Sequence, residues 1–290
     1  RLQWVTGVQT CALPISVLVD DLARECKYEK RHGLCLYIET ESKKILFDLG
    51  PNDTFIRNAK RMDIDLKEVD TVVISHGHRD HGGGLESFLN INNKAKIYVN
   101  RFAFNDYYLR MFGNIKHNIG LNKDYKWNDR VVLVNGLYKV DDGVLLFNKI
   151  RGKEFVPLSN KKLLKKRRNA YVEDDFSHEQ NLLLNEGNKS VLFVGCGHRG
   201  IINILKEAER ISRSPIDYFF GGLHLYNYAN KKYEDDNLIE NISKVLKDKE
   251  TLLYCCHCTG EDAYSKIKKN LKDKIKLIKV GDCINTWRSE

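Results

Sequence analysis

The chain has 290 residues, of which 42% are hydrophobic, 30% charged and 10% aromatic, a composition typical of a folded globular protein and not of a disordered one. No apolar run approaches the roughly 18 residues that a membrane-spanning helix requires, so we expect no membrane partner. The formal net charge of +9 favours anionic partners without specifying which.

Both ends of the chain look extraneous. The segment VTGVQTCALPI resembles the translation of a sequencing adapter, and the terminal RSE resembles the start of one. We therefore expect artefactual residues at 1–15 and 288–290 around a single domain over 16–287, with a genuine irregular N-terminal arm as the alternative. The first sixteen residues lack the apolar core and cleavage site of a signal peptide, so we expect a cytoplasmic protein with reduced thiols.

Strand-like and helix-like segments alternate along the first half. Hydrophobic periodicity and turn residues predict strands at 17–21, 34–40, 43–50, 71–75 and 94–100, and helices at 52–61 and from 85 to 90. Residues 101–130 are aromatic and irregular and indicate a large surface insertion.

The second half repeats this order of strands followed by helices. The same signals predict strands at 130–135, 139–150, 180–196, 215–221 and 251–258, and helices at 201–211, 237–247 and 261–271. A turn at 185–188 divides the segment 180–196 into two strands. Two halves of this kind favour an α/β fold in which sheet packs on sheet with helices outside.

The stretch SHGHRDHGGG, residues 75–84, follows a short buried strand. It holds His76, His78, Asp80 and His81, although the whole chain has only nine histidines. Neutral imidazoles and a carboxylate suit zinc, and also iron or manganese. The grouping predicts two metals, one on His76 and His78 and the other on Asp80 and His81. We expect the three glycines that follow to allow a sharp turn and to keep bulk away from the bound group.

The same stretch resembles the HxHxDH signature of the metallo-β-lactamase superfamily, and LFDLG upstream and TVVISHGHRDHGGGL around it resemble the family context. This resemblance implies a four-layered αββα metallo-β-lactamase sandwich with a metal site at one edge between the sheets. The motifs HGLCLYIET, FSHEQNL, GCGHRGIINI, GGLHL and HCTG extend it, over about residues 17–285, to a subgroup. That subgroup is related to 7,8-dihydropterin-6-methyl-4-(β-D-ribofuranosyl)-aminobenzene-5′-phosphate synthase.

The resemblance implies further ligands at later strand ends. His178, before a strand–turn–strand unit, matches the third histidine of the family, and His257 in HCTG matches the last. Cys196 stands where most members place a metal-bridging aspartate, which is a departure from the pattern. The Cys196 thiolate could replace that carboxylate, or His198 could take over, and we favour His198.

Each of these assignments has an alternative. Cys196 could be a small buried hydrophobe, and His178 a helix cap or surface residue. The cluster 255–258 could form a separate zinc site, although it is tighter than the usual C-x₂₋₄-C spacing. His224 in GGLHL either lines the pocket or faces the core.

These features support the hypothesis of a hydrolase with two divalent ions, zinc first, with iron or manganese as alternatives. Ions about 3.5–4 Å apart share a water, and the resulting hydroxide attacks an ester or phosphoester of a small anionic, pterin-related substrate. Asp80 would orient the nucleophile while it ligates. Asp48 would fix an imidazole tautomer or cap a turn, and Glu179 would support His178 or face solvent.

Two other functions compete with this one. The positive charge, with a dense basic run at 161–168 that suggests a short amphipathic helix, prompts a nuclease or RNA-processing enzyme. That run lacks interleaved aromatic residues, so we do not expect a nucleic-acid partner; the run either holds a phosphate over the site or is solvated. The second alternative is a non-catalytic metal- or redox-responsive binding protein. Oligomeric state stays open, and the Lys-, Asn- and Ile-rich composition suggests an AT-rich bacterial genome.

Overall fold

A computed structural model describes residues 13–286. Of the two segments expected to be extraneous, residues 1–12 and 288–290 lie outside the described residues, as does Trp287 at the expected end of the domain. Residues 13–15 were assigned to the adapter, yet they belong to the body of the fold: strand β1 is Pro14–Val19, and Leu13 and Ile15 are fully buried. The expected domain start at residue 16 therefore falls inside a strand.

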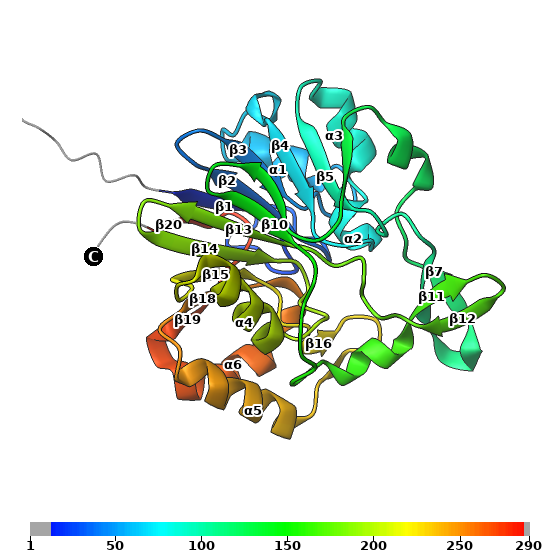
Figure 1. Ribbon diagram of the computed structural model, residues 1–290, viewed down its shortest axis with the longest axis vertical. Coiled ribbons are helices and arrows are strands. Elements are labelled where there is room, and N and C mark those ends of the chain that lie inside the picture. Colours follow the sequence, from blue (N-terminus) through cyan, green and yellow to red (C-terminus); the bar gives the residue numbers. More distant parts are fainter. Residues whose placement is uncertain (1–12, 287–290) are drawn as a thin grey trace, which may run out of the picture.

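Two mixed seven-stranded sheets form the centre of the described chain (Figure 1). The first has the order β20 (Cys283–Asn285), β1, β2 (Cys35–Glu39), β3 (Lys44–Phe47), β4 (Thr71–Ile74), β5 (Lys96–Asn100) and β8 (Val131–Val134). The second has the order β19 (Ile275–Leu277), β18 (Leu252–Cys255), β15 (Tyr218–Gly221), β14 (Lys189–Val194), β13 (Asn181–Glu186), β10 (Val144–Phe147) and β9 (Tyr138–Asp141).

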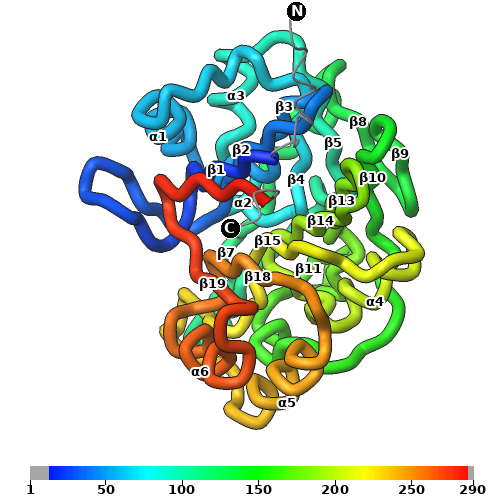
Figure 2. The backbone as a smooth tube through the Cα atoms, turned by 90° about the vertical axis from the view of Figure 1, so that its left-hand side faces the viewer, coloured from blue at the N-terminus to red at the C-terminus, as the bar shows by residue number. Residues whose placement is uncertain are grey.

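Helices cover the outer face of each sheet (Figures 1 and 2). The first sheet packs against α1 (Thr54–Arg61) and α3 (Leu85–Ile91), and the second against α4 (Ile201–Ser212), α5 (Asp236–Lys247) and α6 (Glu261–Leu271). These helices match those predicted from periodicity. The resulting layers confirm the αββα sandwich.

The inner faces of the two sheets meet in an apolar core. Phe47 of β3 and Phe193 of β14 are fully buried there, with ring centroids 6.0 Å apart. Strand residues on these faces are mostly β-branched, leucine or aromatic, which is the composition that a sheet buried on both sides favours. The fold is therefore held by burial on three parallel interfaces, one between the sheets and one under each helical layer.

Within each sheet, four of the seven strands run parallel to one another. Strands β3, β4, β5 and β8 are parallel neighbours in the first sheet, and β14, β15, β18 and β19 in the second. The carboxyl ends of parallel strands share one edge of a sheet, where loops commonly build sites. Short helix α2 (Arg79–Gly82) follows β4 at this edge.

A third, four-stranded antiparallel sheet projects beside that edge (Figure 1); we call it the accessory sheet. Its order is β12 (Ala170–Glu173), β11 (Leu163–Arg167), β6 (Tyr107–Arg110) and β7 (Lys116–Asn118). Two predictions were wrong here. The insertion at 101–130 contains two strands and is not wholly irregular, and the basic run at 161–168 forms strand β11, preceded by a 3₁₀ turn at Leu158–Lys162, and not an amphipathic helix.

A two-stranded hairpin, β16 (Tyr226–Asn227) and β17 (Lys232–Tyr233), lies across the second sheet's loops. Among residues 13–286, no helix is long and apolar enough to cross a membrane.

Candidate metal centre

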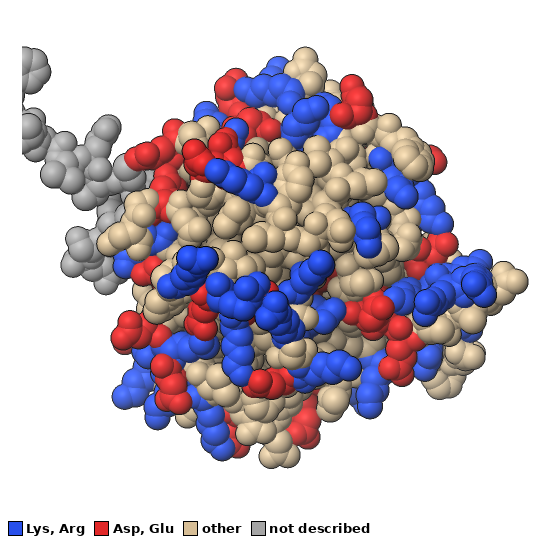
Figure 3. Space-filling model, in the orientation of Figure 1, with Lys and Arg blue, Asp and Glu red and all other residues tan. Residues whose placement is uncertain are grey.

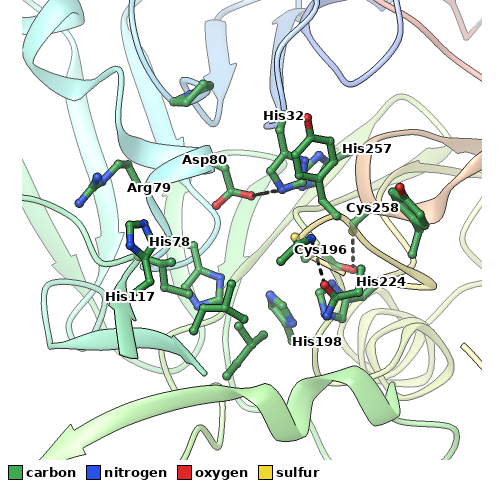
Figure 4. Close-up of a pocket in the computed structure, with 18 of the residues that line it drawn as sticks. His32, His78, Arg79, Asp80, His117, Cys196, His198, His224, His257 and Cys258 are labelled. Atoms are coloured by element: carbon green, nitrogen blue, oxygen red, sulfur yellow. Dashed lines mark hydrogen bonds and ion pairs between the residues drawn. The ribbon is translucent and has the colours of Figure 1, made fainter. Parts of the chain in front are cut away.

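The ends of parallel strands in both sheets deliver the chemically active side chains to one place (Figure 4). His76 follows β4 in the first sheet. In the second sheet, Cys196 and His198 follow β14, His224 follows β15 and His257 follows β18. The site therefore lies across the edge between the sheets, where the sequence placed it.

One group of ligand atoms comes from His76, His78 and His198, which we call the three-histidine cluster. Their candidate ligand atoms all lie within 4.8 Å of one another. His76 Nε2 is 3.0 Å from His78 Nδ1. The Nε2 atoms of His78 and His198 are buried and have no hydrogen-bond partner among residues 13–286. Buried nitrogens that lack a partner carry a desolvation cost, which a metal ion would remove.

Burial keeps this cluster neutral. It lowers the pKa of His78 to about 3 and holds the pKa of His76 and of His198 well below the ordinary histidine value. Only the neutral imidazole offers a lone pair to a metal. At neutral pH the three rings are therefore uncharged, and each has one ring nitrogen with a lone pair for a metal.

The second group, the mixed cluster, consists of Asp80, His81, Cys196 and His257, again with all ligand atoms within 4.8 Å. The Cys196 Sγ is 3.2 Å from His81 Nε2. The Asp80 Oδ2 is 3.5 Å from His81 Nε2 and 3.4 Å from His257 Nε2. Carboxylate, imidazole and thiol together form a donor set that zinc accepts.

In the mixed cluster, unlike the three-histidine cluster, the histidines have raised pKa values and are protonated at neutral pH. Burial alone would lower the pKa of His81, but the carboxylates of Asp48 and Asp80 outweigh it and raise this pKa to about 9. Burial likewise opposes a charged His257, whose pKa Asp21 nevertheless raises above its usual range. A metal entering this cluster must displace protons.

Cys196 lies between the two clusters. Besides its place in the mixed cluster, its Sγ lies within 4.8 Å of ligand atoms of His198 and His224. The sequence favoured His198 as the substitute for a bridging aspartate. The Cys196 Sγ lies near ligand atoms of both clusters, whereas the ligand atoms of His198 group with those of His76 and His78. Burial raises the pKa of the Cys196 thiol, so metal binding must also remove this proton.

Asp48 supports both clusters from behind. Its carboxylate accepts hydrogen bonds from the backbone N–H and the hydroxyl of Ser75, each at 2.7 Å, and lies 2.6 Å from His81 Nδ1. Ser75 Oγ in turn lies 2.9 Å from His76 Nδ1. These contacts fix which ring nitrogen of each histidine faces the site. Asp48 holds a left-handed backbone conformation with φ of 62°, and such strain often marks functional positions.

Two aspartates hold the His257 loop. Asp21 Oδ1 lies 2.9 Å from His257 Nδ1, and Asp20 accepts the His257 backbone N–H at 2.6 Å. Burial and the neighbouring Asp21 raise the pKa of Asp20 to about 7. Asp21 also lies 3.0 Å from His32 Nδ1, which brings His32 to the rim of the site, 3.6 Å from Asp80.

A pocket of about 390 Å³ opens over both clusters and is lined by residues from four parts of the fold. His78, Asp80, Cys196, His198 and His257 form its floor. Its walls include Arg79 of α2, the accessory-sheet residues Leu109, His117 and Leu163, and the hairpin residues Tyr226 and Tyr228. The His32 and Tyr228 rings stack with centroids 4.1 Å apart.

Comparison with known proteins accounts for this architecture. Residues 28–156 match the family model described as the metallo-beta-lactamase superfamily. A crystal structure of a metal-dependent hydrolase of the beta-lactamase superfamily superposes with a TM-score of 0.79 at 28% identity, covering 94% of this chain and 98% of that one. The chain is thus similar to the metallo-β-lactamase superfamily in sequence over residues 28–156 and in fold over nearly its whole length.

Two curated relatives of the chain come from Methanocaldococcus jannaschii. One is an uncharacterized protein, 28% identical over 260 residues that cover 88% of this chain and 94% of the relative. The other is named 7,8-dihydropterin-6-methyl-4-(beta-D-ribofuranosyl)-aminobenzene-5'-phosphate synthase, 27% identical over 290 residues that cover 94% of this chain and 96% of the relative. The chain is thus similar in sequence to the subgroup that its motifs resembled.

His178, the predicted third histidine ligand, is grouped with His78 and Asp174 and not with His76 and His198. Its Nδ1 accepts the Gly77 backbone N–H at 2.8 Å, and its Nε2 lies 2.9 Å from Asp174 Oδ2. With both ring nitrogens engaged, His178 holds the loop that carries His76 and His78. His198 instead lies with His76 and His78; its backbone N–H donates to Glu179 at 2.7 Å and its Nδ1 lies 2.9 Å from Asn160 Oδ1. Glu179 therefore supports His198, and not His178.

The glycines after the histidine motif also act differently from the prediction. Gly83 and Gly84 have ordinary negative φ angles of −65° and −76°, so no turn requires glycine there. Instead, a Cβ would lie 2.3 Å from the Pro51 carbonyl oxygen at Gly83 and 2.4 Å from that of Leu49 at Gly84. These glycines allow α2 to pack closely against the loop after β3.

His224 faces the site and not the core. Its ring lies 4.1 Å from that of His198, and both of its ring nitrogens are buried without a hydrogen-bond partner within residues 13–286. His32, Asp21 and Asn160 escaped the sequence analysis. The sequence did contain a hint for His32 and Asp21, because His32 lies just before a predicted strand and Asp21 at the end of another, and polar residues at strand ends often build sites. It contained no such hint for Asn160.

Proposed function

We propose that the protein is a metal-dependent hydrolase that cleaves an ester or phosphoester bond in a small anionic molecule. The observation that carries this proposal is the pair of ligand clusters with Cys196 between them on the floor of an open pocket. Two neighbouring metal sites under a substrate-sized cavity suit hydrolysis better than storage or a purely structural role, because the cavity gives a substrate access to both.

The donor set favours zinc. The three-histidine cluster supplies three neutral imidazoles, and the mixed cluster supplies Asp80, His81, His257 and the Cys196 thiolate. A thiolate is a soft ligand that suits zinc better than manganese. Two bound divalent ions would polarise the attacked oxygen and bring the pKa of water toward neutrality.

The chain's own residues position the reacting groups. Asp80 directs its carboxylate toward His32 and His257 at the pocket floor (Figure 4), where it can accept a proton from an attacking water. Asp48 and Asp21 fix the orientation of His81 and His257 from outside the pocket, so the floor stays ordered while substrates exchange.

The pocket walls support an anionic substrate with a flat ring. Arg79 and His117 line one side and offer donors to a phosphate. On the other side, Tyr228 is 55% exposed and stacks on His32, which gives a surface for an aromatic ring. The 27% identical relative is named for a pterin and aminobenzene compound that carries a phosphate. We propose a phosphorylated, ring-containing substrate of this class.

The test is hydrolysis of aryl phosphate monoesters, diesters and carboxylic esters by chain stripped of metal and reloaded with zinc, manganese or iron. The Asp80→Asn variant should lose about 100-fold or more in kcat/KM with any active metal. Asp175→Asn is the matched control, because Asp175 is a nearby exposed carboxylate paired with Lys165, and it should keep full activity. Equal activity with and without metal, or an unaffected Asp80→Asn variant, would contradict the proposal.

A further inference from the structure

One face of the accessory sheet lines the pocket, and on its other face Leu164 is buried while Tyr171 is 39% exposed. Leu109, His117 and Leu163 are cross-strand neighbours in β6, β7 and β11, and all three line the pocket. Successive residues of a strand point to opposite faces. The outer face therefore carries the alternate residues, among them Tyr108, which meets Tyr171 of β12 edge-to-face at 4.9 Å.

Most of the chain's excess positive charge is concentrated in this element. Residues 107–118 and 158–173 contain eight Lys and Arg against one acidic residue, Glu173, a net charge of +7 out of +9 for the chain. Figure 3 shows Lys and Arg gathered on the projecting part at the right. Within the described chain, Lys165 pairs with Asp175, and the other seven have no carboxylate partner: Arg110, Lys116, Lys161, Lys162, Lys166, Arg167 and Arg168.

Exposed apolar side chains occur in the same element. At the β6–β7 turn, Phe112 is 97% exposed, Ile115 66% and Met111 48%. Gly113 in that turn has a φ of 69°, and a Cβ there would meet nothing within 4 Å, so the turn stands clear of the body. Of the ten large hydrophobic residues exposed in the described chain, six lie in this element, the other three being Leu158, Tyr171 and Val172. Such a concentration marks an interaction surface.

The partner must accept aliphatic side chains and cations together. We propose that the accessory sheet docks on an anionic lipid bilayer, with Phe112 and Ile115 at the acyl boundary and the Lys and Arg residues on the headgroups. The surface of a bilayer places anionic headgroups directly above an apolar acyl region, so it can accept both kinds of side chain. A nucleic acid would accept the cations and stack on Phe112 and Tyr171, but it offers no apolar phase to Ile115 and Met111. A second copy docked isologously would set like charges against one another.

This surface is independent of the proposed hydrolysis. The absence of a spanning segment, from which no membrane partner was expected, does not bear on a contact that stays at the interface. Because β6, β7 and β11 also line the pocket, docking would bring the pocket close to the lipid–water boundary.

The test is co-sedimentation of the full chain with vesicles of phosphatidylcholine alone or mixed with phosphatidylglycerol. The chain should bind the mixed vesicles, and added salt should weaken binding. The double variant Phe112→Ser, Ile115→Ser should bind at least about tenfold more weakly, and so should Arg167→Glu, Arg168→Glu. Trp127→Ser is the matched control, since Trp127 is 79% exposed beside Lys126 but lies outside the accessory sheet. It should bind like the parent.

All the substituted side chains are exposed, so the variants should fold, and circular dichroism checks this independently of binding. Three results would overturn the proposal. The first is no binding to the mixed vesicles, and the second is binding that the Phe112 and Ile115 changes leave unaltered. The third is that the chain does not bind the vesicles but instead binds a single-stranded RNA oligonucleotide, or self-associates in sedimentation, through the same residues.

Discussion

The two clusters should respond differently to pH, because the histidines of one are neutral and the mixed cluster contains a protonated, charged histidine. His78 has a pKa of about 3 and His81 a pKa of about 9. A metal competes with protons for its ligands, so the affinity of a site falls with falling pH only below the pKa of its free ligands. Between pH 8 and pH 6 the three-histidine cluster has no proton to displace, whereas the mixed cluster has at least one.

The magnitude follows from His81 alone. A group with a pKa of about 9 is about 99% protonated at pH 7, and each proton displaced lowers the metal affinity about tenfold per unit of pH. From pH 8 to pH 6 the mixed cluster should therefore lose at least about 100-fold in zinc affinity. The raised pKa values of Cys196 and His257 act in the same direction. The affinity of the three-histidine cluster should stay nearly constant over this range.

The assay is zinc titration of metal-free protein by calorimetry at pH 6, 7 and 8, with a competing chelator for the tighter site. Repeating each titration in buffers of different ionisation enthalpy counts the protons released. We expect one pH-independent step and one step that weakens with acid and releases protons. If the zinc affinities of both steps fall together with falling pH, the mixed cluster does not differ in charge from the three-histidine cluster. The same conclusion would follow if the pH-sensitive step released no protons.

Three further outcomes follow from the contacts of individual residues. His178→Asn should keep its metal, since both ring nitrogens of His178 bind protein groups, but should lower the free energy of unfolding by about 1–3 kcal/mol in urea titrations; loss of metal would make His178 a ligand after all. Asp48→Asn should weaken zinc binding about 10- to 100-fold, measured by chelator competition, and unchanged affinity would deny Asp48 its supporting role. Phe193→Ala should destabilise the metal-free protein by about 3–5 kcal/mol in urea, and a loss below 1 kcal/mol would show that the core between the sheets closes around the gap.

The sequence predicted the body of the fold because its signals there are local. Buried strands such as Thr71–Ile74 and amphipathic helices such as Ile201–Ser212 carry their periodicity within a few residues. The prediction was wrong for the accessory sheet because its structure depends on contacts between residues far apart in the sequence. Leu163–Arg167 looks helical by its charge, and only pairing with the distant strand Tyr107–Arg110 makes it β-structure.

The same distinction applies to the site. His76, His78, Asp80 and His81 are adjacent in sequence and could be grouped without a structure. The roles of His178 and His198 could not be separated from the sequence, because the two histidines flank the same pair of strands, β13 and β14. In the structure Asp174 and Gly77 occupy both ring nitrogens of His178, whereas His198 Nε2 has no hydrogen-bond partner among residues 13–286. The run 161–168 contains no aromatic residue, so nothing in the sequence indicated that aromatic rings and cations meet in the accessory sheet. They come together from separate strands: Lys116 Nζ of β7 lies 5.0 Å from the centroid of the Tyr171 ring of β12.

The central claim is that two adjacent clusters each hold one metal ion. The most direct measurement is metal content per chain by mass spectrometry for the parent, for His198→Ala, for His257→Ala and for His117→Ala as a control at an exposed histidine outside both clusters. We predict about two equivalents in the parent and the control, and about one in each of the first two variants. One equivalent or less in the parent, or contents that neither His198→Ala nor His257→Ala changes, would contradict the account.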